Sequence, residues 1–168
     1  MTVEEIYVAI APKLTNYLVG SGSSYATACD IVQETFVRVW NRRDELMDDW
    51  TQVRGFVFAI ARNYRIDLLR RTARETLEPG IAYAGSYQTD FESADEAAEI
   101  RRRVNVALAT LPPTLREAFT LFRLGEFSVR EIARMTNATE ANVKVRIHRA
   151  TAKVREALGA VTSEGSKS

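Results

Sequence analysis

Apolar side chains recur every three or four residues along most of this chain, the spacing that places them on one face of an α-helix. No stretch shows the alternating pattern of a β-strand, so the predicted fold class is all-α. Five helices are expected before the C-terminal segment, at about residues 3–19, 25–42, 53–74, 95–110 and 114–124. Pro12 lies inside the first of them and should kink it or divide it.

Each apolar stripe should face a hydrophobic core. The stripes of the first four helices are Ile6, Ile10, Leu14, Tyr17 and Leu18; Ala28, Val32, Thr35, Phe36 and Val39; Val57, Ile60, Ala61, Tyr64 and Leu68; and Ala97, Ile100, Val104, Ala107 and Leu108. Residues 75–94 contain Pro, Gly and Ser without a sustained period, which predicts a flexible linker. The chain is therefore interpreted as two small helical domains, 1–74 and 95–161, with a disordered polar tail at 162–168.

The net charge of +1 hides an uneven distribution of charged side chains. Residues 75–99 hold seven acidic side chains and no basic one. From residue 100 to the end, thirteen basic side chains stand against six acidic ones. A basic domain of this kind favours binding to nucleic acid, and the acidic segment before it needs a separate explanation.

The C-terminal domain contains a predicted helix-turn-helix between Ser128 and Ala150. Ser128 and Glu131 have the spacing of a capping box at the start of its first, short helix, whose Ile132 and Ala133 should face inward. Asn137 can adopt the left-handed conformation that the turn requires, and Thr139 can cap the second helix. The apolar stripe of that second helix is Val143, Ile147, Ala150, Val154 and Leu158.

The opposite face of the second helix is basic and carries small residues, which suits close approach to a DNA major groove. Its candidate DNA-binding side chains are Asn142, Lys144, Arg146, His148 and Arg149. The alternative is an ordinary solvated amphipathic helix whose cations bind nothing.

The predicted third helix also has a basic side. It carries Arg62, Arg65, Arg70, Arg71 and Arg74, with Asp67 as the lone acid and with Phe56, Phe58 and Tyr64 interleaved. Guanidinium groups and aromatic rings together suit backbone phosphates and unstacked bases. The alternative places the aromatic rings in the core, and this alternative is favoured for Tyr64.

Little in the sequence indicates catalysis or a metal. A single cysteine, Cys29, and a single histidine, His148, exclude an internal disulfide and the usual zinc ligand sets. Asp30 and Glu34 lie one helical turn apart, but without further ligands they suit a docking surface, or a solvated face, better than a metal. No catalytic residue, metal or cofactor is expected. The chain has neither a membrane-spanning apolar run nor an N-terminal signal pattern, so a cytoplasmic protein is expected.

With these elements placed, three stretches resemble bacterial sigma factors of the extracytoplasmic-function (ECF) group. Residues 30–40, DIVQETFVRVW, resemble the helix that binds core RNA polymerase. Ile60-Ala61-Arg62-Asn63, Ile66-Asp67 and Arg70-Arg71 resemble the segment that melts and recognises the minus-ten element. Leu111-Pro112-Pro113, Arg116-Glu117, Glu131-Ile132-Ala133, Val143-Lys144, Arg146 and His148-Arg149-Ala150 resemble region four, which recognises the minus-thirty-five element.

The resemblance implies a sigma factor without catalysis that directs core polymerase to specific promoters and aids melting, with core polymerase, promoter DNA and an anti-sigma factor as partners. It assigns polymerase binding to Asp30, Gln33, Glu34, Arg38 and Trp40. It assigns the minus-ten element to Phe56, Arg62, Asn63, Arg65, Arg70 and Arg71. A loop within Asp48–Arg54 would help to form a pocket for a flipped base. The second domain would recognise the minus-thirty-five element through Asn142, Lys144, Arg146, His148 and Arg149.

The acidic linker would pass through a basic channel of the polymerase, although plain disorder explains its composition as well. The chain also departs from the family pattern. Phe56 stands where Trp is usual, Ala141-Asn142 stand in place of Gly-Thr, and Val145 in place of Ser. The resemblance therefore does not imply that this chain shares the promoter preference of its relatives.

Two other classes of protein stay open. A repressor would use the C-terminal domain alone, form dimers and ignore polymerase. A nuclease would use Asp30 and Glu34, but the chain lacks the histidine and carboxylate constellation that such an enzyme needs.

Overall fold

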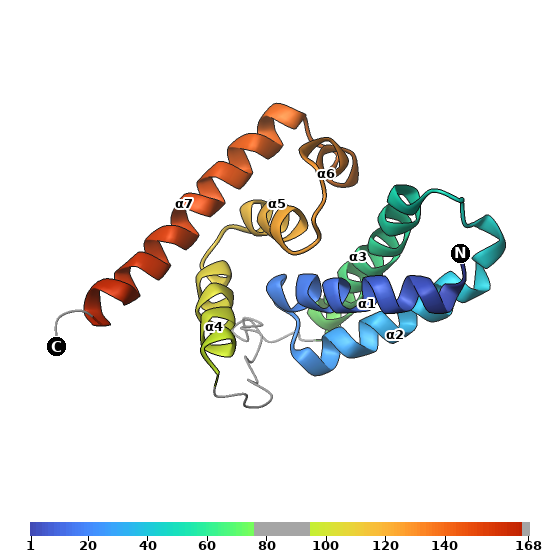
Figure 1. Cartoon of the computed structure of the whole chain (residues 1–168), viewed down its shortest axis with the longest axis horizontal. Coiled ribbons are helices and arrows are strands. Elements are labelled where there is room, and N and C mark those ends of the chain that lie inside the picture. Colours follow the sequence, from blue (N-terminus) through green and yellow to red (C-terminus); the bar gives the residue numbers. More distant parts are fainter. Residues whose placement is uncertain (76–94, 166–168) are drawn as a thin grey trace. The chain divides into compact units, whose positions relative to one another are not determined.

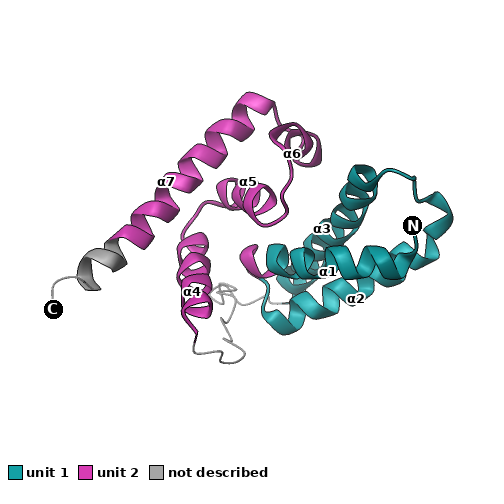
Figure 2. Cartoon of the chain, in the orientation of Figure 1, with its two compact units in different colours: residues 1–18, 23–88 teal, residues 19–22, 89–168 magenta. Residues whose placement is uncertain are grey.

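The computed structural model describes residues 1–75 and 95–165, with side chains described as far as Gly159. Within these residues the chain forms seven α-helices, one 3₁₀ turn and no strand, which confirms the all-α prediction (Figure 1). The helices divide between two compact units, the first with α1 through Leu18, α2 and α3, and the second with α4 to α7 (Figure 2). Apart from Glu75, the predicted linker 75–94 lies outside the described residues.

The first unit contains three long helices. They are α1 (Val3–Gly20), α2 (Tyr25–Asn41) and α3 (Trp50–Glu75), with the 3₁₀ turn η1 (Arg43–Glu45) between the last two. Side chains cap each start: the Thr2 hydroxyl accepts from the Glu5 amide (3.2 Å), Ser24 accepts from Thr27 (3.1 Å), and the Asp49 carboxylate accepts from Thr51 (2.9 Å).

The core of the first unit confirms the stripes predicted for the first two helices. Its fully buried side chains include Ile6, Ile10, Leu14, Leu18, Ala28, Ile31, Val39, Val53, Val57 and Ala61. Tyr17 and Phe58 pack with their ring centroids 5.5 Å apart. Of the stripe predicted for the third helix, Val57, Ile60 and Ala61 are buried, whereas Tyr64 and Leu68 are half-buried.

Pro12 does not divide the first helix, because α1 continues through it from Val3 to Gly20. Proline removes the amide hydrogen that would bond the carbonyl of Val8 one turn earlier. Val8 is 75% exposed and Pro12 is exposed as well, so water can satisfy that carbonyl. The apolar stripe on the other side of the helix holds both halves against the core.

The second unit is built on its last helix. Its elements are α4 (Glu96–Ala109), α5 (Pro113–Arg123), α6 (Val129–Thr136) and α7 (Glu140–Gly165). A central cluster of buried side chains joins three of these helices and the loop after α4: Ala107, Leu108, Leu111, Phe119, Ala150 and Val154. Gly125 closes α5, where a Cβ atom would lie 2.8 Å from both the Leu121 carbonyl oxygen and the Phe127 ring.

Two features of this unit differ from the sequence-based expectations. Ala97 and Ile100 were expected to face inward, but both are exposed, Ile100 by 50%. The core cluster takes side chains of α4 only from Val104 onward, so Ala97 and Ile100 lie outside it. In addition, α7 continues to Gly165, past residue 162 where the disordered tail was expected, since polar residues do not by themselves end a helix that is already nucleated.

Candidate nucleic-acid interface

The helix-turn-helix has the local structure that its sequence predicts. Ser128 and Glu131 form a reciprocal capping box, with the Glu131 amide donating to the Ser128 hydroxyl (3.1 Å) and the Ser128 amide to the Glu131 carboxylate (3.2 Å). Asn137 is left-handed, with φ 54° and ψ 45°, and the Thr139 hydroxyl accepts from the amide of Asn142 (3.1 Å). These contacts fix how α6 leads into α7.

Burial divides α7 into two faces. Val143, Ile147, Ala150 and Val154 are buried, as predicted, and Leu158 is half-buried. The side chains predicted to bind DNA all lie off this buried stripe: Asn142, Lys144, His148 and Arg149 are exposed and Arg146 is half-buried. Val145, which is 46% exposed, lies among them and offers an apolar contact. The structure thus brings the whole predicted set onto the solvent-facing side of one helix.

Two cations on α6 were absent from the predicted set. Arg130 and Arg134 are both exposed and lie one turn apart on the short helix. In helix-turn-helix proteins the first helix crosses the DNA backbone, where arginine binds phosphate. The spacing of four residues on a helix whose Ile132 and Ala133 point inward was the signal that could have identified them.

The basic side of α3 is only partly open to solvent. Asn63, Arg70 and Arg71 are exposed, whereas Arg62 and Arg65 are half-buried. Phe56 is half-buried, but Phe58 is completely buried against Tyr17. The interpretation of Phe58 as part of a base-binding surface is therefore wrong. Its ring lies on the side of α3 that packs on α1.

The predicted polymerase-binding residues occupy the outer side of α2. Asp30 and Gln33 are exposed, and Trp40 is 47% exposed. Glu34 and Arg38, however, pair with each other, with Arg38 Nε 3.1 Å from Glu34 Oε1. The Arg38 guanidinium also lies 4.6 Å from the centre of the Tyr64 ring on α3.

Two more arginines follow at the end of α2, and each covers an aromatic ring. Arg42 lies 4.8 Å from the centre of the Phe56 ring, and Arg43 lies 4.6 Å from that of Trp40. Arg42 also binds Glu45 of η1 through a contact of 2.7 Å between Nη2 and Oε2. This hydrogen bond lowers the pKa of the Glu45 carboxyl and raises the pKa of Arg42.

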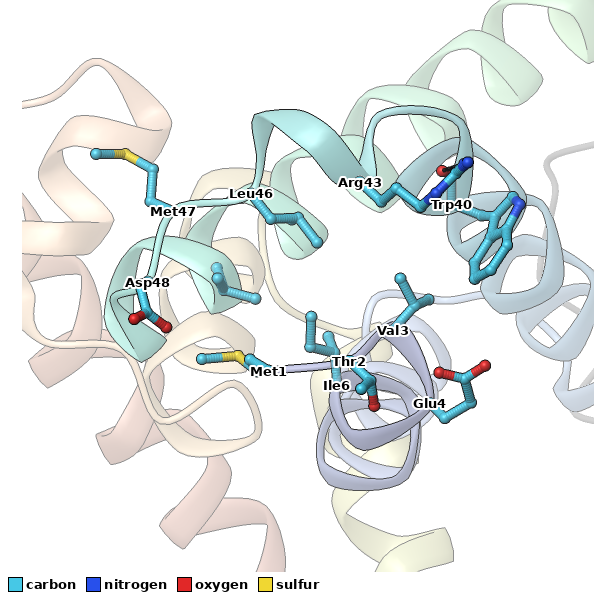
Figure 3. Close-up of a pocket in the computed structure, with 11 residues that line it drawn as sticks. Met1, Thr2, Val3, Glu4, Ile6, Trp40, Arg43, Leu46, Met47 and Asp48 are labelled. Atoms are coloured by element: carbon cyan, nitrogen blue, oxygen red, sulfur yellow. Dashed lines mark hydrogen bonds between the residues drawn. The ribbon is translucent and has the colours of Figure 1, made fainter.

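Two hollows flank these arginines. The larger, of about 510 Å³, lies between the start of α1, the end of α2 and the loop at residues 46–49 (Figure 3). It is lined by Met1, Thr2, Val3, Glu4, Ile6, Trp40, Arg43, Leu46, Met47, Asp48 and Val53. The smaller, which we call the α2–α3 cleft, measures about 270 Å³ and is lined by Arg38, Asn41, Arg42, Ile60 and Asn63.

The loop before α3 is shorter than expected. Because Asp49 caps α3, the helix begins at Trp50, and residues 50–54 of the predicted pocket loop are helical. Only Asp48 and Val53 of the predicted segment line the larger hollow.

Neither a metal site nor a membrane span is found in the described part of the chain. Residues 1–75 and 95–165 contain no group of three His, Cys, Asp or Glu side chains placed to hold a metal ion. None of the helices that the structure describes is long and apolar enough to cross a membrane.

Comparison with known proteins links both units to a single family. The family model of sigma-70 region 2 matches residues 6–75, and that of sigma-70 region 4 matches residues 101–154. The ECF RNA polymerase sigma factor SigM of Bacillus subtilis is 29% identical over 165 residues, which cover 98% of each chain. The ECF RNA polymerase sigma factor RpoE of Cereibacter sphaeroides is 28% identical over 152 residues, covering 90% of this chain and 83% of the relative.

Two solved structures share the fold. The sigma factor RpoE of Bartonella quintana, solved in complex with the anti-sigma factor NepR, gives a TM-score of 0.71 at 22% identity and covers 93% of this chain and 96% of that one. CnrH, solved in complex with the cytosolic domain of CnrY, gives a TM-score of 0.65 at 23% identity and covers 94% and 88%.

Proposed function

The chain belongs to the sigma-70 family, as an RNA polymerase sigma factor of the ECF type that acts in transcription initiation, and we propose that its two units divide promoter recognition between them. One observation carries this proposal: each unit exposes its own set of basic and amide side chains, on α3 in the first and on α7 in the second. The two domains proposed for these roles span residues 1–74 and 95–161.

The second unit recognises the minus-thirty-five duplex. Asn142, Lys144, Arg146, His148 and Arg149 of α7 reach the bases and phosphates of the major groove, and Arg130 and Arg134 of α6 bind the backbone beside it. The exposed Val145 supports this assignment, since an apolar side chain in the groove can contact the methyl group of thymine.

The first unit recognises and melts the minus-ten element. Phe56, Arg62, Asn63, Arg65, Arg70 and Arg71 of α3 hold the separated strand. A flipped base enters the larger hollow beside the loop 46–49 (Figure 3). The volume of this hollow, about 510 Å³, lies in the range of about 300–1,000 Å³ that ligand sites occupy.

Core polymerase binds the outer side of α2 through Asp30, Gln33, Glu34, Arg38 and Trp40. Support comes from the exposed Trp40, because tryptophan is enriched among the side chains that dominate protein interfaces. The acidic linker occupies a basic channel of the polymerase. The protein works in the cytoplasm, without catalysis of its own, until an anti-sigma factor sequesters it, as NepR and CnrY bind the two structural neighbours.

Run-off transcription with purified core polymerase on a promoter library tests the proposal. The full chain should bring polymerase to a defined set of promoters that share two separated sequence elements. A protein that forms dimers, binds duplex DNA alone and leaves core polymerase behind in a pull-down would be a repressor, and the proposal would fail.

A further inference from the structure

The α2–α3 cleft is lined mainly by basic and amide side chains. Its lining residues are two arginines, Arg38 and Arg42, two asparagines, Asn41 and Asn63, and one apolar residue, Ile60. No carboxylate lines the cleft. A hollow of about 270 Å³ with such walls is complementary to a compact group rich in hydrogen-bond acceptors.

Both arginines are held in place but keep donors to offer. Arg38 binds Glu34 through Nε, and Arg42 binds Glu45 through Nε and Nη2. A guanidinium has five N–H donors. Both Nη groups of Arg38 and Nη1 of Arg42 make no hydrogen bond to the described part of the chain, so they can bind a ligand. The rings of Tyr64 and Phe56 support the two guanidinium planes from α3. A guanidinium group held in this way loses little conformational entropy when it binds a ligand.

The two amides are also available. Asn41 and Asn63 make no side-chain hydrogen bond to residues 1–75 or 95–165. Each can donate two hydrogen bonds from its NH₂ group, which adds neutral donors to the charged ones. The cleft is therefore lined by donor-bearing side chains from two helices, a combination that suits a phosphate group.

We propose that the α2–α3 cleft binds one backbone phosphodiester of the single-stranded minus-ten DNA. This inference rests on the proposed function and extends it, because it makes α2 a DNA-binding element through Asn41 and Arg42. Arg38, which is assigned to polymerase binding above, would contact the phosphate as well, through its Nη groups. A nucleic-acid occupant is favoured over an acidic peptide because Asn63 is shared with the basic side of α3, where Arg70 and Arg71 follow two turns later, in line with a backbone that continues along the helix.

The experiment uses holoenzyme made from core polymerase and the full chain, with a forked promoter probe whose minus-ten segment is single-stranded. Affinity is measured over a range of salt concentrations for wild type, Arg42→Gln and Arg38→Gln. Each substitution should weaken binding about tenfold. Each should also reduce the slope of log K against log salt by about 0.7, the value for one phosphate contact on a single strand.

Arg103→Gln is the matched control. Arg103 is likewise half open to solvent and paired with a glutamate, Glu99, at 3.2 Å, but it lies on α4 and outside the surfaces assigned above. Probes with one neutral methylphosphonate linkage at successive positions identify the phosphate. At one position the modification should weaken probe binding by wild type and leave probe binding by Arg42→Gln unchanged, because the substitution and the modification remove the same contact.

Three results would overturn the inference. Arg42→Gln could bind the probe with the same affinity and salt dependence as Arg103→Gln. Every methylphosphonate linkage that weakens binding of wild type could also weaken binding of Arg42→Gln. Arg42→Gln could lose affinity for core polymerase instead of DNA, which would identify a protein occupant. Failure of wild-type holoenzyme to bind the probe would instead refute the proposed function. Melting temperatures of the variants within a few degrees of wild type exclude misfolding as the cause.

Discussion

Ile132 is the larger of the two buried side chains that hold the first helix of the helix-turn-helix. Replacing it should unfold the second unit at lower temperature and leave the first unit folded. The helix α6 has eight residues, of which only Ile132 and Ala133 are buried. A helix this short is unstable in isolation, so packing must hold it. Ile132→Ala removes the larger of the two anchors from a fully buried position and should cost about 2–5 kcal/mol, a large part of the stability of a small domain.

The two tryptophans offer an assay that separates the units. Trp40 and Trp50 both lie in the first unit, so tryptophan fluorescence reports on it alone, whereas far-UV circular dichroism reports on all helices. In Ile132→Ala the dichroism of the full chain should begin to fall roughly 10 °C or more below wild type. The fluorescence transition should stay in place, and core polymerase should still bind.

Ile132→Val is the matched control, because it keeps most of the buried side chain and should cost only about 0.5–1.5 kcal/mol. Equal melting temperatures of Ile132→Ala and Ile132→Val would contradict the anchoring role of Ile132. A joint shift of fluorescence and dichroism would contradict independent unfolding of the second unit.

Three further predictions concern the interfaces and pH. Arg149→Ala should lower run-off transcription from a duplex promoter at least several-fold while a pull-down shows unchanged binding to core polymerase, and a loss of both would contradict the assignment of α7. Glu34→Ala or Trp40→Ala should do the reverse and weaken polymerase binding first, as measured by competition for limiting core enzyme. The hydrogen bond from Arg42 lowers the pKa of Glu45 in the folded state, so this pair stabilises the fold above the usual pKa of a glutamate and is lost as the pH falls through the lowered pKa. An NMR titration should show that Arg42→Gln returns the Glu45 pKa to its usual range, and an unchanged titration would refute the pairing.

Several errors of the sequence-based interpretation share one origin. Proline usually interrupts a helix, yet α1 continues through Pro12. Val8 is exposed, so water can satisfy its carbonyl, which the proline leaves without an amide partner. Ile100 continues an apolar period, yet the part of α4 that carries it extends past the core of its unit. Phe58 belongs to a run of aromatics beside arginines, yet it faces α1. In each case the expectation came from the residue type and its period within one helix, whereas its exposure or burial was set by what surrounds that helix in the folded unit.

What the sequence alone determined is local. The capping box at Ser128, the left-handed Asn137 and the cap at Thr139 are contacts between residues at most a few positions apart, so spacing and residue type suffice to predict them. Periodicity likewise separates the buried and exposed faces of α7 without knowledge of its neighbours.

Only the tertiary structure decided which side chains from different helices meet. Arg38 and Tyr64 are 26 positions apart in sequence, and Arg42 and Phe56 are 14 apart, yet each guanidinium lies within 5 Å of its ring centre. Such contacts depend on how closely and at what rotation α2 packs against α3, and these quantities are set by the whole core between them. The α2–α3 cleft exists because of that packing, and the sequence pattern of either helix alone does not predict it.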